Sequence, residues 1–231
     1  MELEVLLEAL PPEQEKRVAF MIGRCNPPTS GHYKVISKMK EYIRKHPELK
    51  LEAQPIVVII EGVKTSKDKS KNPLTAEERI KFMQSSGKAN GVKFLIAKNG
   101  FVALGAIRDN GYEPIAIGAG SDRAEGYKKL LDKNFKTEDD KSIEHIIIPG
   151  LDREETSTIE RKNEKQKALD NAIQKLNDEE EIADDEISGS LARHAVKLGY
   201  EEEFAKIVGL ENKPKLAKLM FDKIKKAMEN S

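Results

Sequence analysis

The sequence has little of several residue types, and each scarcity excludes a class of protein. Among 231 residues there is one cysteine, Cys25, so neither an intrachain disulfide nor a zinc site built from several cysteines can form. Tryptophan is absent and aromatic residues make up 5%, which argues against a platform that stacks nucleic-acid bases. Long apolar runs are missing too, so we expect a soluble protein without a membrane-spanning helix.

Charge is abundant but balanced. Lysine plus arginine and aspartate plus glutamate number 40 each, so the chain has no overall field that would attract nucleic acid or an anionic membrane. We therefore predict small-molecule partners, with neither nucleic acid nor a membrane among them. The first ten residues carry Glu2, Glu4 and Glu8 where a signal peptide has a basic flank, and together with the single cysteine this predicts a cytoplasmic location.

Short apolar runs alternate with helical patterns through the first two thirds of the chain. This alternation is typical of βαβ units that close into a parallel sheet with helices on both faces, so we predict an α/β fold. The predicted strands are residues 17–22, 55–60, 92–97, 114–117 and 143–148, and the predicted helices between them are 31–46, 75–86, 102–110 and 123–133.

The last third of the chain differs in composition. Residues 151–186 form a charged insertion, in which apolar residues at helical spacing (Ala168, Leu169, Ala172, Ile173 and Leu176) predict an amphipathic helix before an acidic, solvated loop. Further helices are predicted at 190–208, with a break near Gly199, and at 213–228, with an apolar face of Leu216, Leu219, Met220, Ile224 and Ala227. The predicted division is an N-terminal helix over 1–16, a main domain over 17–210 and a C-terminal helix over 211–231.

The first candidate motif runs from Gly23 to His32, directly after the first predicted strand. A strand that turns sharply into a helix presents free backbone N–H groups and the positive end of the helix, which together attract phosphate. Gly31 leaves space for a triphosphate close to the backbone, and His32 can donate to phosphate oxygens as charge builds up. A capped helix start with a packed histidine is the alternative for this Gly-His pair alone.

The second candidate motif is residues 187–193, which opens a predicted helix. Ser188 or Ser190 can cap the helix, and Arg193 lies about one turn further on, where it can reach an anion held at the helix start. A simple helix cap with a surface arginine is the alternative. Two such helix starts around one triphosphate would suit phosphoryl chemistry, which depends on positioning and charge neutralisation.

Two further stretches are candidates for which a purely structural role is equally reasonable. Thr75 and Glu78 form a predicted capping box in the stretch from Asn72 to Arg79, and Lys64 precedes it as either a phosphate ligand or an exposed lysine. After the fourth predicted strand, Asp122 and Arg123 can hold a hydroxyl and a phosphate of an acceptor, or a residue there simply caps the next helix.

These stretches together resemble the HIGH superfamily of nucleotidyltransferases. Thr29-Ser30-Gly31-His32 matches the signature (T/H)-x-G-H, preceded by a G-x-F-x-P-like stretch in which Cys25 replaces the aromatic residue. The segment from Ile187 to Arg193 is similar to I-S-x-T-x-x-R with serine in place of threonine. The segment from Asn72 to Arg79 is similar to N-P-(F/L)-T-x-x-E-R of archaeal-type nicotinamide mononucleotide adenylyltransferases.

The resemblance implies a Rossmann-like, doubly wound sheet of five strands in the order 3-2-1-4-5, a nucleoside triphosphate (NTP) donor with Mg²⁺ or another divalent cation, and no metal held by the protein itself. It implies transfer of a nucleotidyl group, AMP ahead of CMP, to a phosphate-bearing acceptor. The expected catalytic residues are His32, Thr29 and Arg193; the nucleotide-binding residues are Gly23, Arg24, Asn26, Gly31, Lys64, Ser188 and Ser190; the acceptor-binding residues are Asp122, Arg123 and Arg79.

Other possibilities remain open from the sequence. Similar sequences occur in large tailed phages, so a non-catalytic binding or structural protein, such as a virion component, is the alternative to an enzyme. An aminoacyl-tRNA synthetase fragment is disfavoured because a chain of balanced charge offers tRNA little to bind. The apolar helix faces are compatible with a homo-oligomer or with virion assembly as well as with a monomer.

Overall fold

The computed structural model describes residues 16–62, 68–120, 144–147, 158–178 and 187–230, together with residues 126, 180 and 182. The side chains of 144–147 and 158–165 lie outside this description. Of the predicted elements, the N-terminal helix up to residue 15 and the helix at 123–133 fall outside the described residues, apart from residue 126. Lys16, predicted as the end of that N-terminal helix, instead opens the first strand, because it pairs with Tyr112.

A parallel sheet forms the centre of the molecule. Strands β1 (Lys16–Gly23), β2 (Ile56–Ile60), β3 (Lys93–Ala97) and β4 (Tyr112–Ala119) lie in the order β3-β2-β1-β4, as predicted for the first four strands. A short backbone segment, β5 (Glu144–Ile147), pairs with the outer side of β4. The register between β1 and β4 shifts after Val18, opposite Pro114, since proline has no N–H to give to the sheet.

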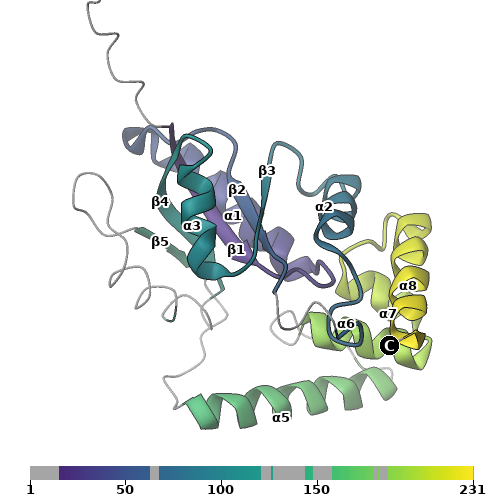
Figure 1. Ribbon diagram of the computed structural model, residues 1–231. Helices are drawn as coiled ribbons and strands as arrows, with labels where there is room; N and C mark the ends of the chain where they lie inside the picture. The colour runs from purple at the N-terminus through teal and green to yellow at the C-terminus, as the bar shows by residue number, and fades with distance from the viewer. Residues whose placement is uncertain are drawn as a thin grey trace, which may run out of the picture.

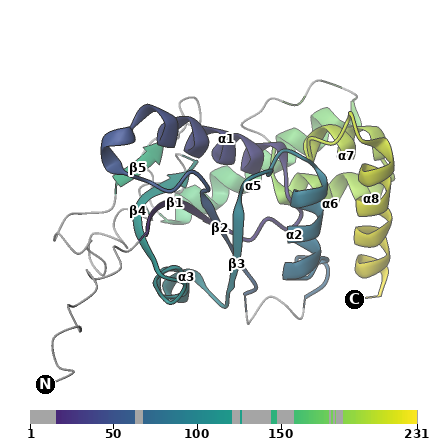
Figure 2. The ribbon, with the colours of Figure 1, turned by 90° about the horizontal axis from the view of Figure 1, so that it is seen from above.

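Helices cover both faces of this sheet. Helix α1 (Ser30–Lys45) covers one face and helix α3 (Gly100–Arg108) the other, as Figure 2 shows from above. Helix α2 (Ala76–Ser85) lies beside β3 and contributes Ala76 and Met83 to the same apolar core as α1. A single 3₁₀ turn, η1 (Pro47–Leu49), follows α1. Helix α3 starts two residues before the predicted position because the Asn99 side chain accepts hydrogen bonds from the N–H groups of Phe101 and Val102.

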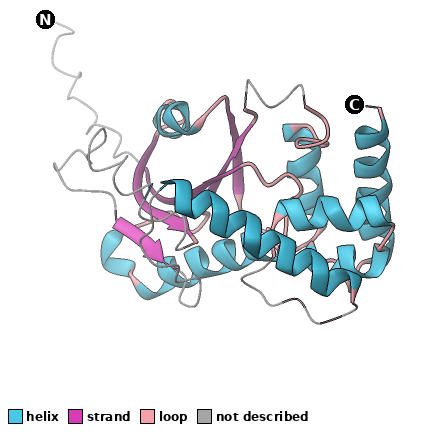
Figure 3. Cartoon of the chain, turned by 90° about the horizontal axis from the view of Figure 1, so that it is seen from below, coloured by secondary structure: helices cyan, strands magenta, loops and turns pink. Residues whose placement is uncertain are grey.

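Beside the sheet lies a second apolar core, built from helices. We call α5 (Thr158–Asn177), α6 (Gly189–Leu198), α7 (Glu201–Ile207) and α8 (Pro214–Glu229) the helical cluster (Figures 1 and 3). The predicted break between α6 and α7 is confirmed, since Gly199 ends α6 in the left-handed conformation at φ 84°. Ala172 and Leu176 of α5 are buried in this core, so part of the charged insertion packs as an integral helix.

The predicted apolar face of α8 is partly wrong. Leu219 is 59% exposed, whereas Ala217, Met220, Phe221 and Ile224 are buried. The helix is turned toward Phe221 because this ring packs edge-on against Phe204 of α7, with 5.4 Å between ring centroids. No helix among the described residues is long and apolar enough to cross a membrane.

Helix α2 belongs to both cores. Its Ala76 and Met83 pack with α1 and the sheet, while Phe82 and the preceding Leu74 pack into the helical cluster. In Figure 1, α2 accordingly lies between the sheet and α8. The boundary between the two cores therefore runs along α2 and past the carboxyl ends of the strands, where parallel sheets bind ligands.

Candidate functional site

The first motif forms a tight loop between β1 and α1. Cys25 is buried and has a φ of 48°, in the left-handed region that favours glycine, and the Asn26–Pro27 peptide bond is cis. A Cβ on Gly23 would lie 3.1 Å from Cys25 Sγ and 3.9 Å from His32 Cδ2. Glycine at the end of β1 thus leaves room for the Cys25 sulfur, which a side chain there would have to displace by a few tenths of an ångström.

Thr29 and His32 are joined as the first turn of α1. The Thr29 N–H donates to His32 Nδ1 over 3.0 Å, and Thr29 Oγ1 lies 2.8 Å from the same ring nitrogen. Since a backbone N–H can only donate, Nδ1 must be the acceptor and the neutral ring carries its proton on Nε2; this tautomer is inferred from the bonding. The predicted helix start is thus a capping box in which histidine takes the place of the usual glutamate.

The second motif lies directly against the first. Ser188 caps α6 by accepting from the Leu191 N–H over 3.1 Å. Arg193 donates through Nη1 to the Asn26 carbonyl over 2.6 Å and through Nη2 to Ser190 Oγ over 3.1 Å. A Cβ on Gly189 would lie 3.1 Å from the Asn26 oxygen, so the two motifs meet at a close backbone contact that favours glycine.

The third stretch holds the same loop from the other side. The Asn26 side chain pairs with the main chain of Leu74, donating to its carbonyl over 2.9 Å and accepting from its N–H over 3.2 Å. Thr75 and Glu78 form the predicted capping box of α2. The Asn26 side chain therefore connects two chain segments. The sequence had suggested a nucleotide-binding role for Asn26 and gave no indication of this structural contact.

Arg79 follows immediately and is 3% exposed. Its Nε donates to the Thr75 carbonyl over 2.9 Å, and its Nη1 donates to the carbonyls of Ile60, over 2.9 Å, and of Arg24. Burial lowers the pKa of Arg79 below its ordinary value, while the carboxylates of Glu61 and Glu77 act in the opposite direction. The structure thus places Arg79 on the main chain of the loop, and its assignment to an acceptor stays a prediction.

Positive charge converges on this loop. Burial, followed by the nearby charge of Arg24, lowers the pKa of Arg193 to about 10, and Asp68 partly offsets this. Arg24 itself is exposed. A buried guanidinium beside a second positive charge is a place where an anion is stabilised, and a triphosphate would supply such negative charge.

Three expected site residues, Lys64, Asp122 and Arg123, lie outside the described residues. Gly31 lies within them: a Cβ there would have Thr29 Oγ1 as its nearest neighbour at 3.8 Å, an ordinary contact distance, so the protein itself has room for a side chain and the role of Gly31 beside a triphosphate stays a prediction. Among the described residues, no group of three or more His, Cys, Asp or Glu side chains could hold a metal ion.

A further contact was missed by sequence reasoning. Gly209, just after α7, packs on the first residue of α1: a Cβ there would lie 3.4 Å from Ser30 Cβ and 3.0 Å from Lys88 Nζ. The helical cluster therefore touches the first motif at both Asn26 and Ser30. A glycine after a helix gives a signal for a helix end but none for what packs on it.

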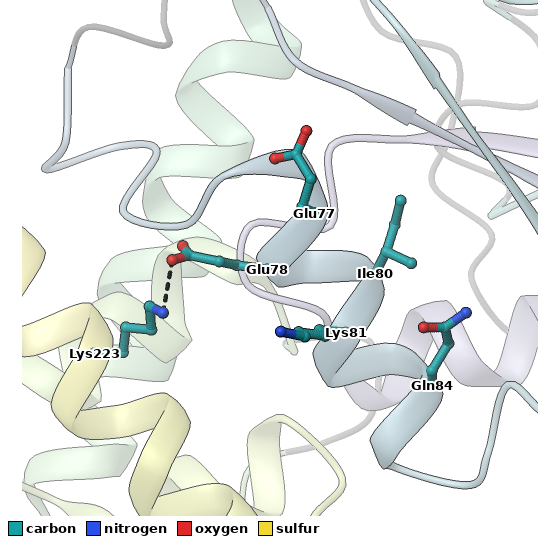
Figure 4. Close-up of a pocket in the computed structure, with 6 residues that line it drawn as sticks. All are labelled: Glu77, Glu78, Ile80, Lys81, Gln84 and Lys223. Atoms are coloured by element: carbon teal, nitrogen blue, oxygen red, sulfur yellow. Dashed lines mark ion pairs between the residues drawn. The ribbon is translucent and has the colours of Figure 1, made fainter.

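A surface hollow of about 420 Å³ lies between α2 and α8 (Figure 4). Its lining residues are Glu77, Glu78, Ile80, Lys81, Gln84 and Lys223, and an ion pair of 2.7 Å joins Glu78 to Lys223 across it. No residue of the first two motifs lines this hollow, so it is a different part of the surface from the loop between β1 and α1.

Comparison with known proteins agrees with this arrangement. The family model described as cytidylyltransferase-like matches residues 20–206, a span from β1 through α7 that includes all three motifs. No curated protein matches the chain.

Proposed function

The chain belongs to the cytidylyltransferase-like family of nucleotidyltransferases, and we propose that it transfers a nucleotidyl group from an NTP to a phosphate-bearing acceptor and releases pyrophosphate. Adenylyl transfer from ATP is the first choice and cytidylyl transfer from CTP the second. The observation that carries the proposal is the bond from Arg193 to the Asn26 carbonyl, which brings the second motif onto the loop of the first.

The proposed reaction needs no nucleophilic side chain. An oxygen of the acceptor phosphate attacks the α-phosphorus, forming a new P–O bond while the bond to the β-phosphate oxygen breaks, and the electron pair leaves with pyrophosphate. Catalysis then consists of holding the two reactants in line and neutralising the charge on the phosphates. We assign the neutralisation of charge to Arg24 and Arg193, which are close enough for the charge of Arg24 to lower the pKa of Arg193.

His32 has a defined protonation in this proposal. Because its Nδ1 accepts from the Thr29 N–H, its donor is the proton on Nε2. A neutral imidazole held in this orientation can donate a hydrogen bond to a phosphate oxygen without any prior proton transfer. Thr29 would act through His32 by fixing the ring.

The remaining parts of the proposal concern groups beyond this loop. We propose that Mg²⁺ arrives with the NTP and is held mainly by phosphate oxygens and water, which suits a site whose described residues offer no carboxylate cluster. Lys64 would face the phosphates, and Asp122 and Arg123 would hold the acceptor, at the ends of strands in a complete doubly wound sheet of five strands.

The direct test combines each of the four NTPs with Mg²⁺ and a panel of phosphomonoesters and measures pyrophosphate release. We expect release with one NTP, ATP before CTP, and only when an acceptor is present. NTP binding is measured in parallel by calorimetry. Absence of both binding and turnover would favour the non-catalytic alternative.

A further inference from the structure

We infer that Arg79 is a positioning residue for the NTP: it holds the main chain of the loop between β1 and α1 in its ligand-binding shape and does not contact the acceptor. The inference rests on the proposed function and deepens it. It replaces the acceptor-binding role that the sequence suggested for Arg79, and it assigns this side chain to binding of the NTP.

The bonds of Arg79 join three separate segments. Nη1 links the Arg24 carbonyl, in the loop after β1, to the Ile60 carbonyl, at the end of β2. Nε donates to the Thr75 carbonyl at the start of α2. Three of the five N–H donors of the guanidinium are thereby directed at main-chain oxygens, in a side chain that is 3% exposed. Such a group is poorly placed to bind a substrate that arrives from solvent.

The Arg24 carbonyl, which accepts a hydrogen bond from Arg79, belongs to the peptide bond directly before Cys25. Cys25 has a φ of 48°, a conformation that is unfavourable for a residue with a side chain. The hydrogen bond from Arg79 fixes the orientation of that peptide plane, so it helps to stabilise the left-handed turn. The side chain of Arg24, on the same peptide, is exposed.

A second arginine binds the main-chain carbonyl two residues further along the loop. Arg193, from α6, donates to the Asn26 carbonyl, so arginines from two different helices hold the loop at residues 24 and 26. Both supports come from segments far away in the sequence, 55 and 167 positions from the carbonyls that they hold. Arg79 supports it from the sheet side and Arg193 from the helical cluster.

Geometry distinguishes arginine from lysine at this position. A guanidinium is planar and reaches several carbonyls at once, whereas an ammonium on a flexible stem keeps the charge but cannot reproduce this pattern. We therefore expect Arg79→Lys to fold, and to lose NTP affinity by about 10-fold to about 100-fold, as for the loss of charged hydrogen bonds. The KM for the acceptor at saturating NTP should stay within about 2-fold of the wild-type value, because the acceptor does not touch this side chain.

The experiment measures NTP affinity by calorimetry, both KM values by pyrophosphate release, and the melting temperature. Lys81→Gln is the matched control, since Lys81 is an exposed cation on the same helix. If Arg79→Lys does not fold, Arg79→Gln is the second variant, because its amide can still donate to two carbonyls.

The outcomes separate the inference from the proposed function. A wild-type protein that binds no NTP overturns the proposed function. If the wild type binds NTP, an increase in acceptor KM alone shows that Arg79 contacts the acceptor and overturns the inference. A lower melting temperature with unchanged NTP affinity also overturns it, because the role of Arg79 would then be in folding only. Lost NTP affinity with an unchanged acceptor KM supports it.

Discussion

The sheet core and the helical cluster are built on different principles and meet at the proposed site. The sheet core consists of continuous apolar strands buried between helices, such as Val57 to Ile59, which are fully buried. The helical cluster consists of amphipathic helices with one buried face each. Neither region contains a complete site. The first motif ends a strand of the sheet, the second motif starts a helix of the cluster, and the site exists where Arg193 crosses between them.

The contacts between the two regions are also of two kinds. At the loop between β1 and α1 they are buried and specific, with Arg193 on the Asn26 carbonyl and Gly189 pressed against it. Between α2 and α8, Phe82 is buried in the helical cluster, whereas the ion pair of Glu78 and Lys223 is partly exposed. The difference between the buried and the exposed polar contacts predicts that changes near the loop affect function strongly, whereas changes of the ion pair between α2 and α8 have small effects on stability.

The largest effect is expected at His32. His32→Ala should lower kcat by about 100-fold to about 1000-fold, because the Nε2 donor that stabilises phosphate charge is lost. The change also removes the partner of the Thr29 N–H, so a small loss of stability is expected. His32→Gln is the matched control, since glutamine at this position of a capping box restores the bond to Thr29 without the imidazole.

Pyrophosphate release and the melting temperature are measured for both His32 variants. We expect both to be slow, and His32→Gln to melt close to the wild type. Wild-type rates in His32→Ala would show that the imidazole only caps α1, and that the charge on the phosphates is neutralised elsewhere.

The sequence predicts the structure of the two regions to different extents. The sheet was predicted well, since continuous apolar runs of five or so residues between helical patterns are typical of buried parallel strands. In the helical cluster the positions of the helices were predicted but the face of α8 was partly wrong. Helical spacing allowed either Leu219 or Phe221 on the buried side, and only the contact with Phe204 decides between them.

The site shows the same limit more clearly. Residue types at the right spacing correctly indicated that Thr29 and Ser188 cap helices, with His32 and Arg193 in the first turns that follow, because a helix start has a recognisable pattern. The bonds from Arg79 and Arg193 to main-chain carbonyls were not predictable. Every residue has a carbonyl, so an acceptor of this kind leaves no signal in the sequence, and the pairing of Asn26 with Leu74 spans 48 positions.

An intermediate effect is expected where the two regions press together. Gly189→Ala adds a Cβ that would lie 3.1 Å from the Asn26 oxygen and 3.5 Å from Arg193 Nη1. Because the neighbour is backbone, the motifs must move apart, at a cost of about 1–3 kcal/mol in the free energy of unfolding. NTP affinity should fall as well, since Arg193 moves with α6.

Gly105→Ala is the matched control for that variant. Gly105 lies inside α3 with no atom within 4 Å of the position of an added Cβ, so alanine should stabilise the protein by about 0.5–1 kcal/mol through its higher helix propensity. Denaturant unfolding measures both variants. An equal change in the free energy of unfolding for Gly189→Ala and Gly105→Ala would mean that Gly189 is not at a close contact. The two motifs would then not depend on each other for their position.

The smallest effect is expected between α2 and α8, where Lys223 and Glu78 form an ion pair of 2.7 Å with side chains that are 47% and 25% exposed. Lys223→Gln should lower the free energy of unfolding by about 0–1 kcal/mol, since solvent and salt screen such a pair. Glu78→Gln keeps the capping box of α2, so a double-mutant cycle with these two changes isolates the ion pair. Lys225→Gln, on the same helix, is the control for a general loss of positive charge. We expect a coupling energy below about 1 kcal/mol that vanishes at about 1 M salt, with unchanged NTP affinity.

A larger coupling energy that resists salt and is accompanied by a change in NTP affinity would contradict this prediction. It would show that the contact between α2 and α8 positions the site as strongly as the contacts at the loop do, and that the distinction between the two kinds of contact is wrong.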